Sequence, residues 1–296
     1  MLPRVVVVHR STAYEDLLAT HGTAGQAAFF LRGRGQELAP VEAEHQTQVR
    51  ALETVLRAIP PRWRRVQLHR AELDRFLFEP EDVVVAVGQD GLVANVARFL
   101  DGQAVVGVNP DPRAYDGVLV RHPPPAAERL LRAAVEQRAR VQPRTMVEAR
   151  LGDGQRLRAL NEIYIGHQSH QSARYQLRWG GQGERHSSSG LIVATGTGAT
   201  GWARSITRER AAVLPLPAPE DRALVFLARE AFPSVATGTA LTQGAVTVEA
   251  PLQVQSEMNT GGTVFGDGME QDHLRLPWGE TVVVQPAEAV LRLVVG

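Results

Sequence analysis

Two glycine-containing segments combine residue types that can hold an anion and move a proton. The first, Val87-Gly88-Gln89-Asp90-Gly91, places a carboxylate between glycines directly after an apolar run. Glycines let backbone N–H groups approach phosphate, and a helix after the turn would add its positive end. Asp90 would repel phosphate, so its presence fits a group that accepts a proton from an attacking hydroxyl or helps hold Mg²⁺. The structural alternative is that Asp90 caps the N-terminus of the helix.

The second segment, Thr195–Trp202, is rich in Gly and Thr and follows the apolar run Leu191–Ala194. Its hydroxyls and N–H groups can bind a polar ligand, and Trp202 can either stack on a ring or pack in the domain interface. Upstream, Asn161 and Glu162 are adjacent, so a strand would point them to opposite faces unless it ends or bulges there. The structural alternative is an Asn that closes a turn beside a solvent-facing Glu.

Composition narrows the chemistry further. The chain has no cysteine and no lysine, so thiolates, disulfides and Schiff bases are excluded, and Asp, Glu, His, Ser and Thr remain. Net charge is zero, no basic stripe indicates nucleic-acid binding, and no apolar run is long enough to span a bilayer. The chain starts directly on a strand-like run, Val5–Val8, without a targeting pattern, which predicts a cytoplasmic protein.

Other polar residues give weaker signals. His167 and His170 have a spacing that could suit a metal, but no third ligand accompanies them. We therefore expect two exposed loop histidines and no metal site. Asp111, Asp267 and Asp272 are expected in loops and are not predicted to be ligands.

The first half of the chain must position the turn that carries Asp90, and it alternates strand and helix signals. Continuous β-branched runs indicate buried strands, and strand, glycine turn, helix, strand is the pattern of a parallel sheet. The expected strands are 4–9, 66–68, 82–87 and 104–108, and the expected helices are 14–28, 41–59 and 93–100.

The second half, which carries the Gly/Thr segment, predicts a mostly antiparallel β domain. A proline-rich linker at 122–125 and a helix at 126–140 precede it. The expected strands are 145–150, 156–165, 173–179, 189–194, 245–255, 281–285 and 290–295, with a hairpin turn at 152–154, a helix at 203–212 and a surface loop at 214–220. We expect domains at 1–123 and 124–296, the last strand being able to return to the first domain.

Four segments in order also resemble one enzyme family. Gly-Gln-Asp-Gly resembles the Gly-Gly-Asp-Gly segment shared by NAD kinases, diacylglycerol and sphingoid kinases and phosphofructokinases. The other three segments resemble NAD kinases alone. Their order and approximate spacing agree with that family from about Asp82 to Ser205. These are Gly107–Pro112 followed by Gly117, Arg158–Gly166 and Ser188–Trp202. The Asn-x-Asp-Pro form of the Gly107–Pro112 segment is that of the mitochondrial-type branch. Gly266-Asp267-Gly268 resembles the family more weakly.

The resemblance implies an α/β N-terminal domain with a parallel, Rossmann-like sheet, of the NAD kinase and diacylglycerol kinase type, and a β-rich C-terminal domain. It implies transfer of phosphate from ATP, carried with Mg²⁺, to the adenosine ribose 2′-hydroxyl of NAD, with Asp90 as the base. The first domain would serve the phosphate donor and the second NAD. The implied phosphate and ATP contacts are Gly88, Gln89, Gly91 and Asn161. The implied NAD contacts are Asn161, Glu162, Ser189, Thr197, Thr200, Gly201, Trp202 and Ser205.

The chain departs from the family pattern at four positions. Gln89 replaces a glycine, Leu92 replaces the usual threonine, Ser189 stands where many relatives have aspartate, and Trp202 where many have tyrosine. A homodimer or homotetramer is implied because β domains of this family commonly pair. Two other functions stay open: a catalytically weak NAD-binding or regulatory protein, and a kinase of the same fold for another nucleotide or small alcohol.

Overall fold

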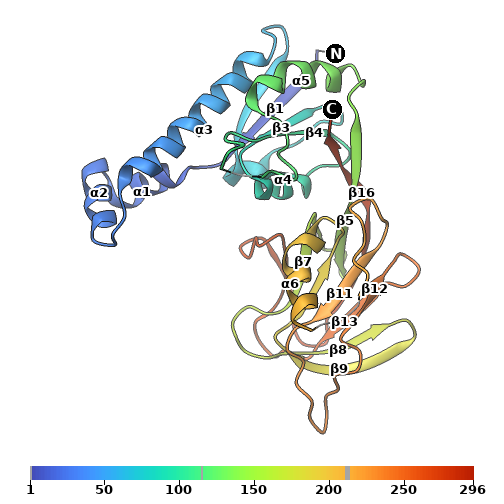
Figure 1. The fold of residues 1–296 in the computed structure, drawn as a ribbon. Coiled ribbons are helices and arrows are strands. Elements are labelled where there is room, and N and C mark those ends of the chain that lie inside the picture. Colours follow the sequence, from blue (N-terminus) through green and yellow to red (C-terminus); the bar gives the residue numbers. More distant parts are fainter. Residues whose placement is uncertain (1, 115, 211–213) are drawn as a thin grey trace. The chain divides into compact units, whose positions relative to one another are not determined.

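The computed structural model, which describes residues 2–114, 116–210 and 214–296, divides into two units (Figure 1). One comprises Met1–Gln142 with Arg292–Gly296, and the other Pro143–Leu291. The sequence predicted the boundary at residue 123, which is too early. Helix α5 (Ala127–Val135) buries Leu130 and Leu131 in the core of the first unit, so the chain up to Gln142 belongs there.

The first unit contains the predicted parallel sheet, in the order β2-β1-β3-β4. Its valine-rich strands are buried on both faces, as expected for a parallel sheet covered by helices. The end of β16 lies parallel to β4 and adds a strand at that edge. The bounds are β1 Arg4–His9, β2 Arg64–His69, β3 Val83–Val87, β4 Ala104–Val108 and β16 Thr281–Val294.

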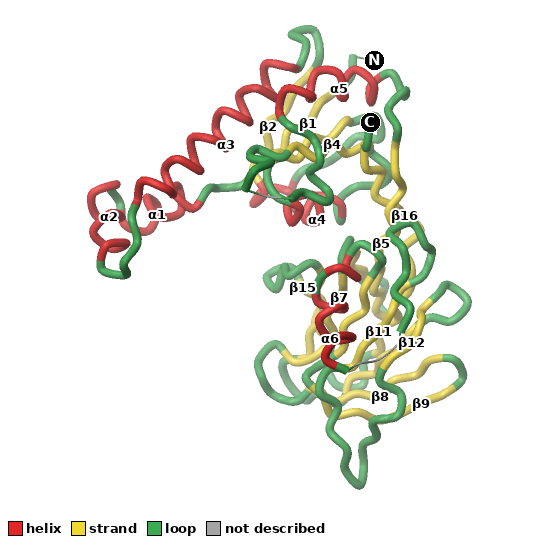
Figure 2. The backbone as a smooth tube through the Cα atoms, in the orientation of Figure 1, coloured by secondary structure: helices red, strands yellow, loops and turns green. Residues whose placement is uncertain are grey.

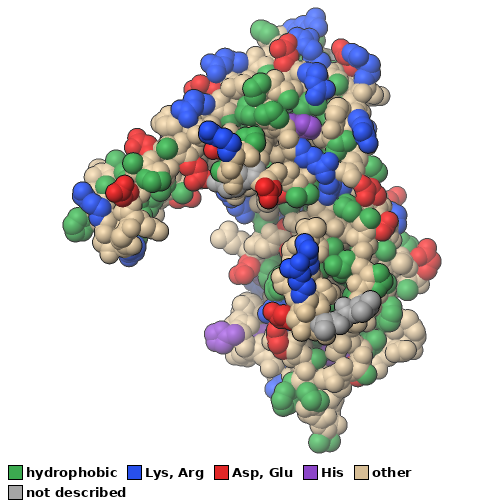
Figure 3. All heavy atoms as spheres, viewed as in Figure 1, with side chains coloured by type: hydrophobic (Ala, Val, Ile, Leu, Met, Phe, Trp, Pro, Cys, Tyr) green, Lys and Arg blue, Asp and Glu red, His purple; other side chains and the backbone are tan. Residues whose placement is uncertain are grey.

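Helices cover both faces of this sheet (Figure 2). On one face α3 (Leu38–Ala58) and α5 contribute Ala51, Val55 and Leu130 to the core. On the other face lies α4 (Asp90–Ala97), which contacts β1, β3 and β4. The exposed face of α3 carries charges of both signs (Figure 3). None of the described helices is long and apolar enough to cross a membrane.

The single helix predicted at 14–28 is two helices. Gly22 adopts φ 81°, which ends α1 (Ala13–His21), and the Thr23 hydroxyl accepts a hydrogen bond from the Gln26 N–H at the start of α2 (Ala24–Arg32). The glycine in this left-handed conformation and the new cap together explain the break. Two short 3₁₀ helices complete the unit, η1 (Arg70–Arg75) and η2 (Pro124–Ala126).

The second unit is β-rich, as predicted, and contains two sets of strands. One is an antiparallel sheet in the order β12-β11-β10-β7-β14-β15, and the other contains β16-β13-β8-β9 with β5 and β6. Apolar side chains of both sets form one core, whereas Tyr164 and Ile192 face the opposite way, toward α6. The bounds are β5 Val141–Leu151, β6 Arg156–Ala159, β7 Glu162–His167, β8 Ala173–Trp179, β9 Gln182–Ser188, β10 Leu191–Ala194, β11 Leu224–Ala228, β12 Gln243–Val246, β13 Leu252–Ser256, β14 Gly262–Gly266, β15 His273–Arg275, η3 Gly198–Thr200 and α6 Trp202–Glu209.

Several predicted strands have different limits. The segment 156–165 breaks at Leu160-Asn161 into β6 and β7, and 245–255 breaks before Pro251 into β12 and β13. Conversely, 281–285 and 290–295 form the single strand β16. Strands β9, β11, β14 and β15 were not predicted. The helix predicted at 203–212 is observed over 202–209, and its last two predicted residues lie outside the described ones.

Gly107 in β4 provides a test of the packing in the first unit. A Cβ at this position would lie 2.1 Å from the Leu119 carbonyl oxygen, and backbone atoms cannot move aside cheaply. We expect Gly107→Ala to lower the free energy of unfolding by about 1–3 kcal/mol in denaturant titrations. Gly25→Ala is the matched control, because a Cβ there meets nothing within 4 Å and alanine favours the helix. Equal stability of the two variants would contradict this packing.

Candidate functional site

The predicted phosphate turn lies where β3 ends and α4 begins. The helix starts at Asp90, three residues earlier than predicted, so Gly91 lies in its first turn. Gln89 occupies the N-cap position with φ −96°, a conformation that a glutamine adopts without strain. Its side chain makes no capping hydrogen bond and instead accepts one from Arg10 at 2.8 Å.

Asp90 binds a neighbouring loop rather than capping the helix. Its carboxylate accepts hydrogen bonds from the backbone N–H groups of Val118, Leu119 and Val120 at 2.9, 2.8 and 2.9 Å. Gly117 precedes this loop with φ 61°, and a Cβ there would lie 2.5 Å from the Val120 carbonyl oxygen. The capping alternative is therefore wrong, since Gln89 is the N-cap residue, and Asp90 fixes the loop that follows Gly117.

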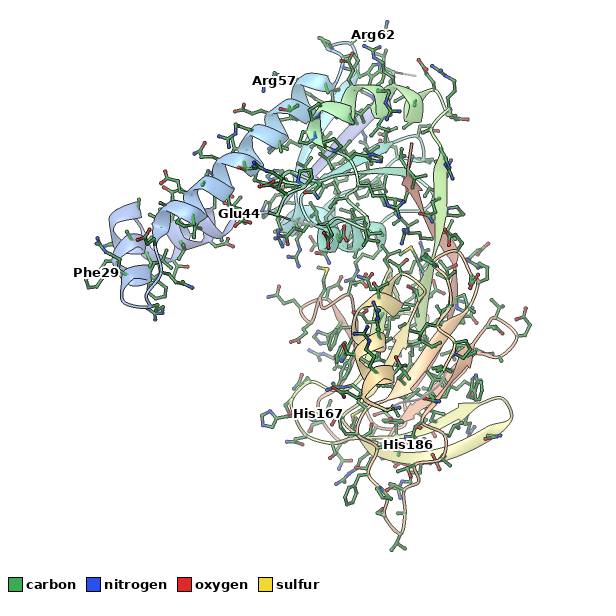
Figure 4. The ribbon with its side chains drawn as sticks, viewed as in Figure 1. Phe29, Glu44, Arg57, Arg62, His167 and His186 are labelled. Carbon is green, nitrogen blue, oxygen red and sulfur yellow. The ribbon has the colours of Figure 1, made fainter. Side chains whose placement is uncertain are left out.

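A pocket of about 420 Å³ opens beside this turn at the carboxyl ends of the parallel strands. Gly88 and Gln89 line it, and Arg10 and Arg113 bring two guanidinium groups. Glu44 of α3, labelled in Figure 4, also lines it. Guanidinium groups suit phosphate oxygens, and the volume is in the range of small-molecule sites. The Gly88 N–H already donates to the Val108 carbonyl at 3.0 Å.

In the second unit, Asn161 and Glu162 lie at the break between β6 and β7. The carboxylate of Asp267 accepts hydrogen bonds from the N–H groups of Leu160, Asn161 and Glu162 at 2.8, 2.7 and 3.3 Å. Asp267 itself adopts φ 52° in the turn after β14. Sequence reasoning placed Asp267 in a loop and missed this role, although Gly266-Asp267-Gly268 was a signal for it.

The Gly/Thr segment is hydrogen-bonded to the backbone of Leu160 and Asn161. The Thr195 N–H donates to the Asn161 carbonyl at 2.9 Å, and the Thr195 hydroxyl donates to the Leu160 carbonyl at 2.6 Å. A Cβ at Gly198 would lie 2.2 Å from the Asn161 carbonyl oxygen, so only glycine allows this approach. The structure thus brings two of the sequence-predicted segments together.

The predicted residues of the Gly/Thr segment differ in exposure. Thr197 is buried, and its hydroxyl accepts a hydrogen bond from the buried Arg144 at 3.3 Å. Thr200, Gly201 and Ser205 are exposed at the start of α6. The Gly201 and Ser205 N–H groups donate to the carbonyls of Gly198 and Gly201, and the Thr200 hydroxyl donates to the Thr197 carbonyl. These residues therefore lie at the surface with donors that are already bound within the segment, whereas the Thr197 side chain is buried beneath it.

Trp202 stacks on Tyr164, and Ser189 is hydrogen-bonded to the residues around these two rings. The Trp202 ring is 37% exposed, lies parallel to the Tyr164 ring with 6.3 Å between centroids, and has the Arg229 guanidinium 4.8 Å from its centroid. The Ser189 N–H donates to the Arg229 carbonyl, and the Ser189 carbonyl accepts from the Tyr164 hydroxyl. This arrangement presents a flat, cation-bearing surface suited to an aromatic ring.

Asn161 and Glu162 combine a fixed backbone with free side chains. Among the described residues, no hydrogen bond is made by the Asn161 amide group or the Glu162 carboxyl group. Burial, followed by the charge of Asp267, raises the pKa of Glu162 to about 7. A carboxyl group kept in this costly environment is typical of functional sites. The alternative of a solvent-facing Glu is therefore wrong.

The histidine prediction is wrong for one residue. His167 is buried at the end of β7, and its Nδ1 accepts a hydrogen bond from the Ser169 N–H at 3.1 Å. The described residues contain no group of three or more His, Cys, Asp or Glu side chains that could hold a metal ion.

Comparisons with known proteins give matches only at the level of structure. No family model matches the chain, and no curated protein does. Yeast NADH kinase complexed with NADH superimposes with a TM-score of 0.60 at 14% identity, covering 100% of this chain and 84% of the kinase. An NAD kinase from Archaeoglobus fulgidus in complex with ATP also gives 0.60, at 20% identity, covering 99% of this chain and 94% of the kinase.

The chain has the NAD kinase fold. This agrees with the fold expected from the four sequence segments. Two of these segments lie in the first unit and two in the second. The Gly88–Gly91 turn of the NAD kinase fold lies in the first unit, and Asn161, Glu162 and the Gly/Thr segment lie in the second.

The raised pKa of Glu162 predicts a pH-dependent cost in stability. The folded chain binds more protons at this group than the unfolded chain between the ordinary value of 4.5 and about 7, so stability falls as pH rises through that window. Glu162→Gln removes the ionisation. We expect the variant to be more stable than the parent at pH 8, by on the order of 2 kcal/mol, and similar near pH 4.5.

Thermal and denaturant unfolding across this pH range would measure the difference. Glu128→Gln is a suitable control, because Glu128 is an exposed partner of Arg132 on α5. A constant stability difference between Glu162→Gln and the parent from pH 4.5 to 8 would contradict the raised pKa.

Proposed function

We propose that the chain is an NAD kinase, which transfers the γ-phosphate of MgATP to the adenosine ribose 2′-hydroxyl of NAD. The observation that carries the proposal is the fixed backbone at Asn161-Glu162, which is joined to Thr195 and Gly198. The Asn161 and Glu162 side chains bond to none of the residues that the structure describes. Two sequence segments that resemble NAD kinases meet there, in a chain with the NAD kinase fold. A yeast protein of that fold was crystallised with NADH, and an archaeal one with ATP.

The proposal gives each unit one substrate. Asn161, Glu162, Ser189 and the exposed part of the Gly/Thr segment would contact NAD. Hydroxyl groups of a ribose are donors that a carboxylate or amide oxygen accepts, and the Trp202 surface suits a planar ring. Gly88, Gln89 and Gly91 would contact the phosphates of MgATP, with Mg²⁺ entering as part of that substrate.

The 420 Å³ pocket in the first unit is the proposed place for the donor. Arg10 and Arg113 would meet phosphate charge that a lysine-free chain cannot meet with ammonium groups. Gln89 adds to this site because it fixes Arg10 by a hydrogen bond, where a glycine would leave that guanidinium unbound. The mitochondrial-type branch, the cytoplasmic location and a homodimer or homotetramer stay predictions.

A second function, an NAD-binding protein without kinase activity, is favoured by one observation. The three N–H groups bound to Asp90 occupy the carboxylate that the sequence assigns as base. If Asp90 must take the proton and these bonds hinder it, the chain would bind NAD but phosphorylate it slowly.

One assay separates these functions. Purified protein with MgATP and NAD is expected to form NADP, measured by reduction with an NADP-specific dehydrogenase, while calorimetry measures NAD binding. NAD binding without NADP formation would contradict the kinase proposal and favour the binding protein. Nucleosides, sugars and lipids as acceptors address a kinase for another alcohol, and phosphorylation of one of these in place of NAD would contradict NAD as substrate.

The donor site gives a separate prediction. Arg10→Met should raise the KM for ATP tenfold or more, because a charged hydrogen bond to phosphate contributes about 1.5–3 kcal/mol, while the KM for NAD stays unchanged. Arg57→Met is the matched control. Arg57 lies on the exposed face of α3 and pairs only weakly, at 3.7 Å, with Glu53 (Figure 4). An unchanged KM for ATP in Arg10→Met would contradict this donor site.

A further inference from the structure

Arg144 is a charged side chain enclosed within the second unit. It lies near the start of β5, is 2% exposed, and is the largest of the fully buried side chains among the described residues. Taking a guanidinium group out of water costs free energy, and an apolar side chain of similar length would avoid that cost. An arginine at this position therefore indicates a role for its hydrogen bonds that packing alone does not supply.

The Arg144 guanidinium contacts the Gly/Thr segment from inside the unit. Its Nη1 donates to the hydroxyl of Thr197 at 3.3 Å. Thr197 is itself buried, its N–H donates to the Thr195 hydroxyl at 3.1 Å, and its carbonyl accepts the Thr200 hydroxyl at 3.3 Å. Thr197 thus connects the buried guanidinium to an exposed residue at the end of η3.

The start of β5 also supports the segment through a neighbouring turn. A Cβ at Gly196 would lie 2.0 Å from the Ala218 carbonyl oxygen, so the segment packs closely against the turn that contains Ala218 and Pro219. The Pro219 carbonyl in that turn accepts the Thr145 N–H at 2.9 Å. The segment therefore depends on β5 in two ways, and Arg144 supplies the charged hydrogen bond.

We propose that Arg144 is a positioning residue, which fixes Thr197 and with it the Gly/Thr segment in the form that binds NAD. The inference rests on the proposed function, in which exposed residues of this segment contact NAD. Arg144 is too deeply buried to present its guanidinium at the surface, so it acts through Thr197. All these residues belong to the second unit.

A side chain that only fills the core would behave differently. Its replacement would loosen the packing around it on every side, and the Thr197 hydroxyl would have no part in the effect. A positioning residue instead acts on one segment and through one partner. Local hydrogen exchange and the coupling between Arg144 and Thr197 separate these two roles.

The first test needs no ligand. In Arg144→Met, amide hydrogen exchange across residues 196–201 should rise by about tenfold or more, while exchange in β8 and β9 stays as in the parent. Arg150→Met is the matched control, because Arg150 lies on the same strand with a side chain that is 56% exposed and pairs with Glu148. Unchanged exchange at 196–201 in Arg144→Met would overturn the inference, and so would an equal rise throughout the second unit.

The second test is a double-mutant cycle on the Kd for NAD, measured by calorimetry with Arg144→Met, Thr197→Val and the double variant. Each single change should raise the Kd by about fivefold or more, and the double variant should be no weaker than the weaker single one, because both changes break the same hydrogen bond. The KM for ATP should stay unchanged. Thr197→Val removes only the hydroxyl contact, so it tests the same link if Arg144→Met does not fold.

Two results of the cycle would contradict the role of Arg144: single effects that multiply in the double variant, or a Kd for NAD in Thr197→Val equal to that of the parent. A parent protein that does not bind NAD is a different result, because it contradicts the proposed function. Hydrogen exchange would then still decide whether Arg144 positions the Gly/Thr segment.

Discussion

The carboxylate of Asp267 is the constraint on which the site in the second unit depends. It binds three consecutive N–H groups at the break between β6 and β7, where the chain has left one strand and has not entered the next. Backbone groups in such a gap must find partners. Because Asp267 accepts them, the Asn161 and Glu162 side chains make no hydrogen bond with any described residue, and Thr195 and Gly198 can pack against the carbonyls of Leu160 and Asn161.

The same anchor also affects the ionisation of Glu162. A second carboxylate beside a half-buried one raises the free energy of the ionised form, and the resulting pKa of about 7 is a cost that the folded chain carries above that pH. Asp90 in the first unit shows the same bonding pattern as Asp267, three N–H groups on one carboxylate, and likewise organises a glycine-containing turn. In both units an aspartate shapes the backbone, and in the second unit the neighbouring Glu162 has a fixed backbone and a carboxyl group that bonds to no described residue.

Local patterns were enough to predict the parallel sheet, because valine runs and glycines act within a few residues. The family resemblance, rather than local pattern, assigned ligand roles to Asn161-Glu162 and the Gly/Thr segment, and those roles stay predictions. The Asp267 anchor could not be predicted this way, since it joins residues more than 100 positions apart. Three N–H bonds to Asp90 likewise depend on a loop 28 to 30 residues away. The domain boundary was misplaced because helix α5, although it follows a proline-rich segment, buries its apolar face in the first unit.

The most direct test of the account is a ¹³C NMR titration of protein labelled at glutamate carboxyl carbons, with the Glu162 resonance assigned by its loss in Glu162→Gln. The account predicts a midpoint near pH 7 for this one resonance and a shift of it when NAD is added. A midpoint below pH 5, with no response to NAD, would contradict both the buried environment of Glu162 and its proposed place in the NAD site.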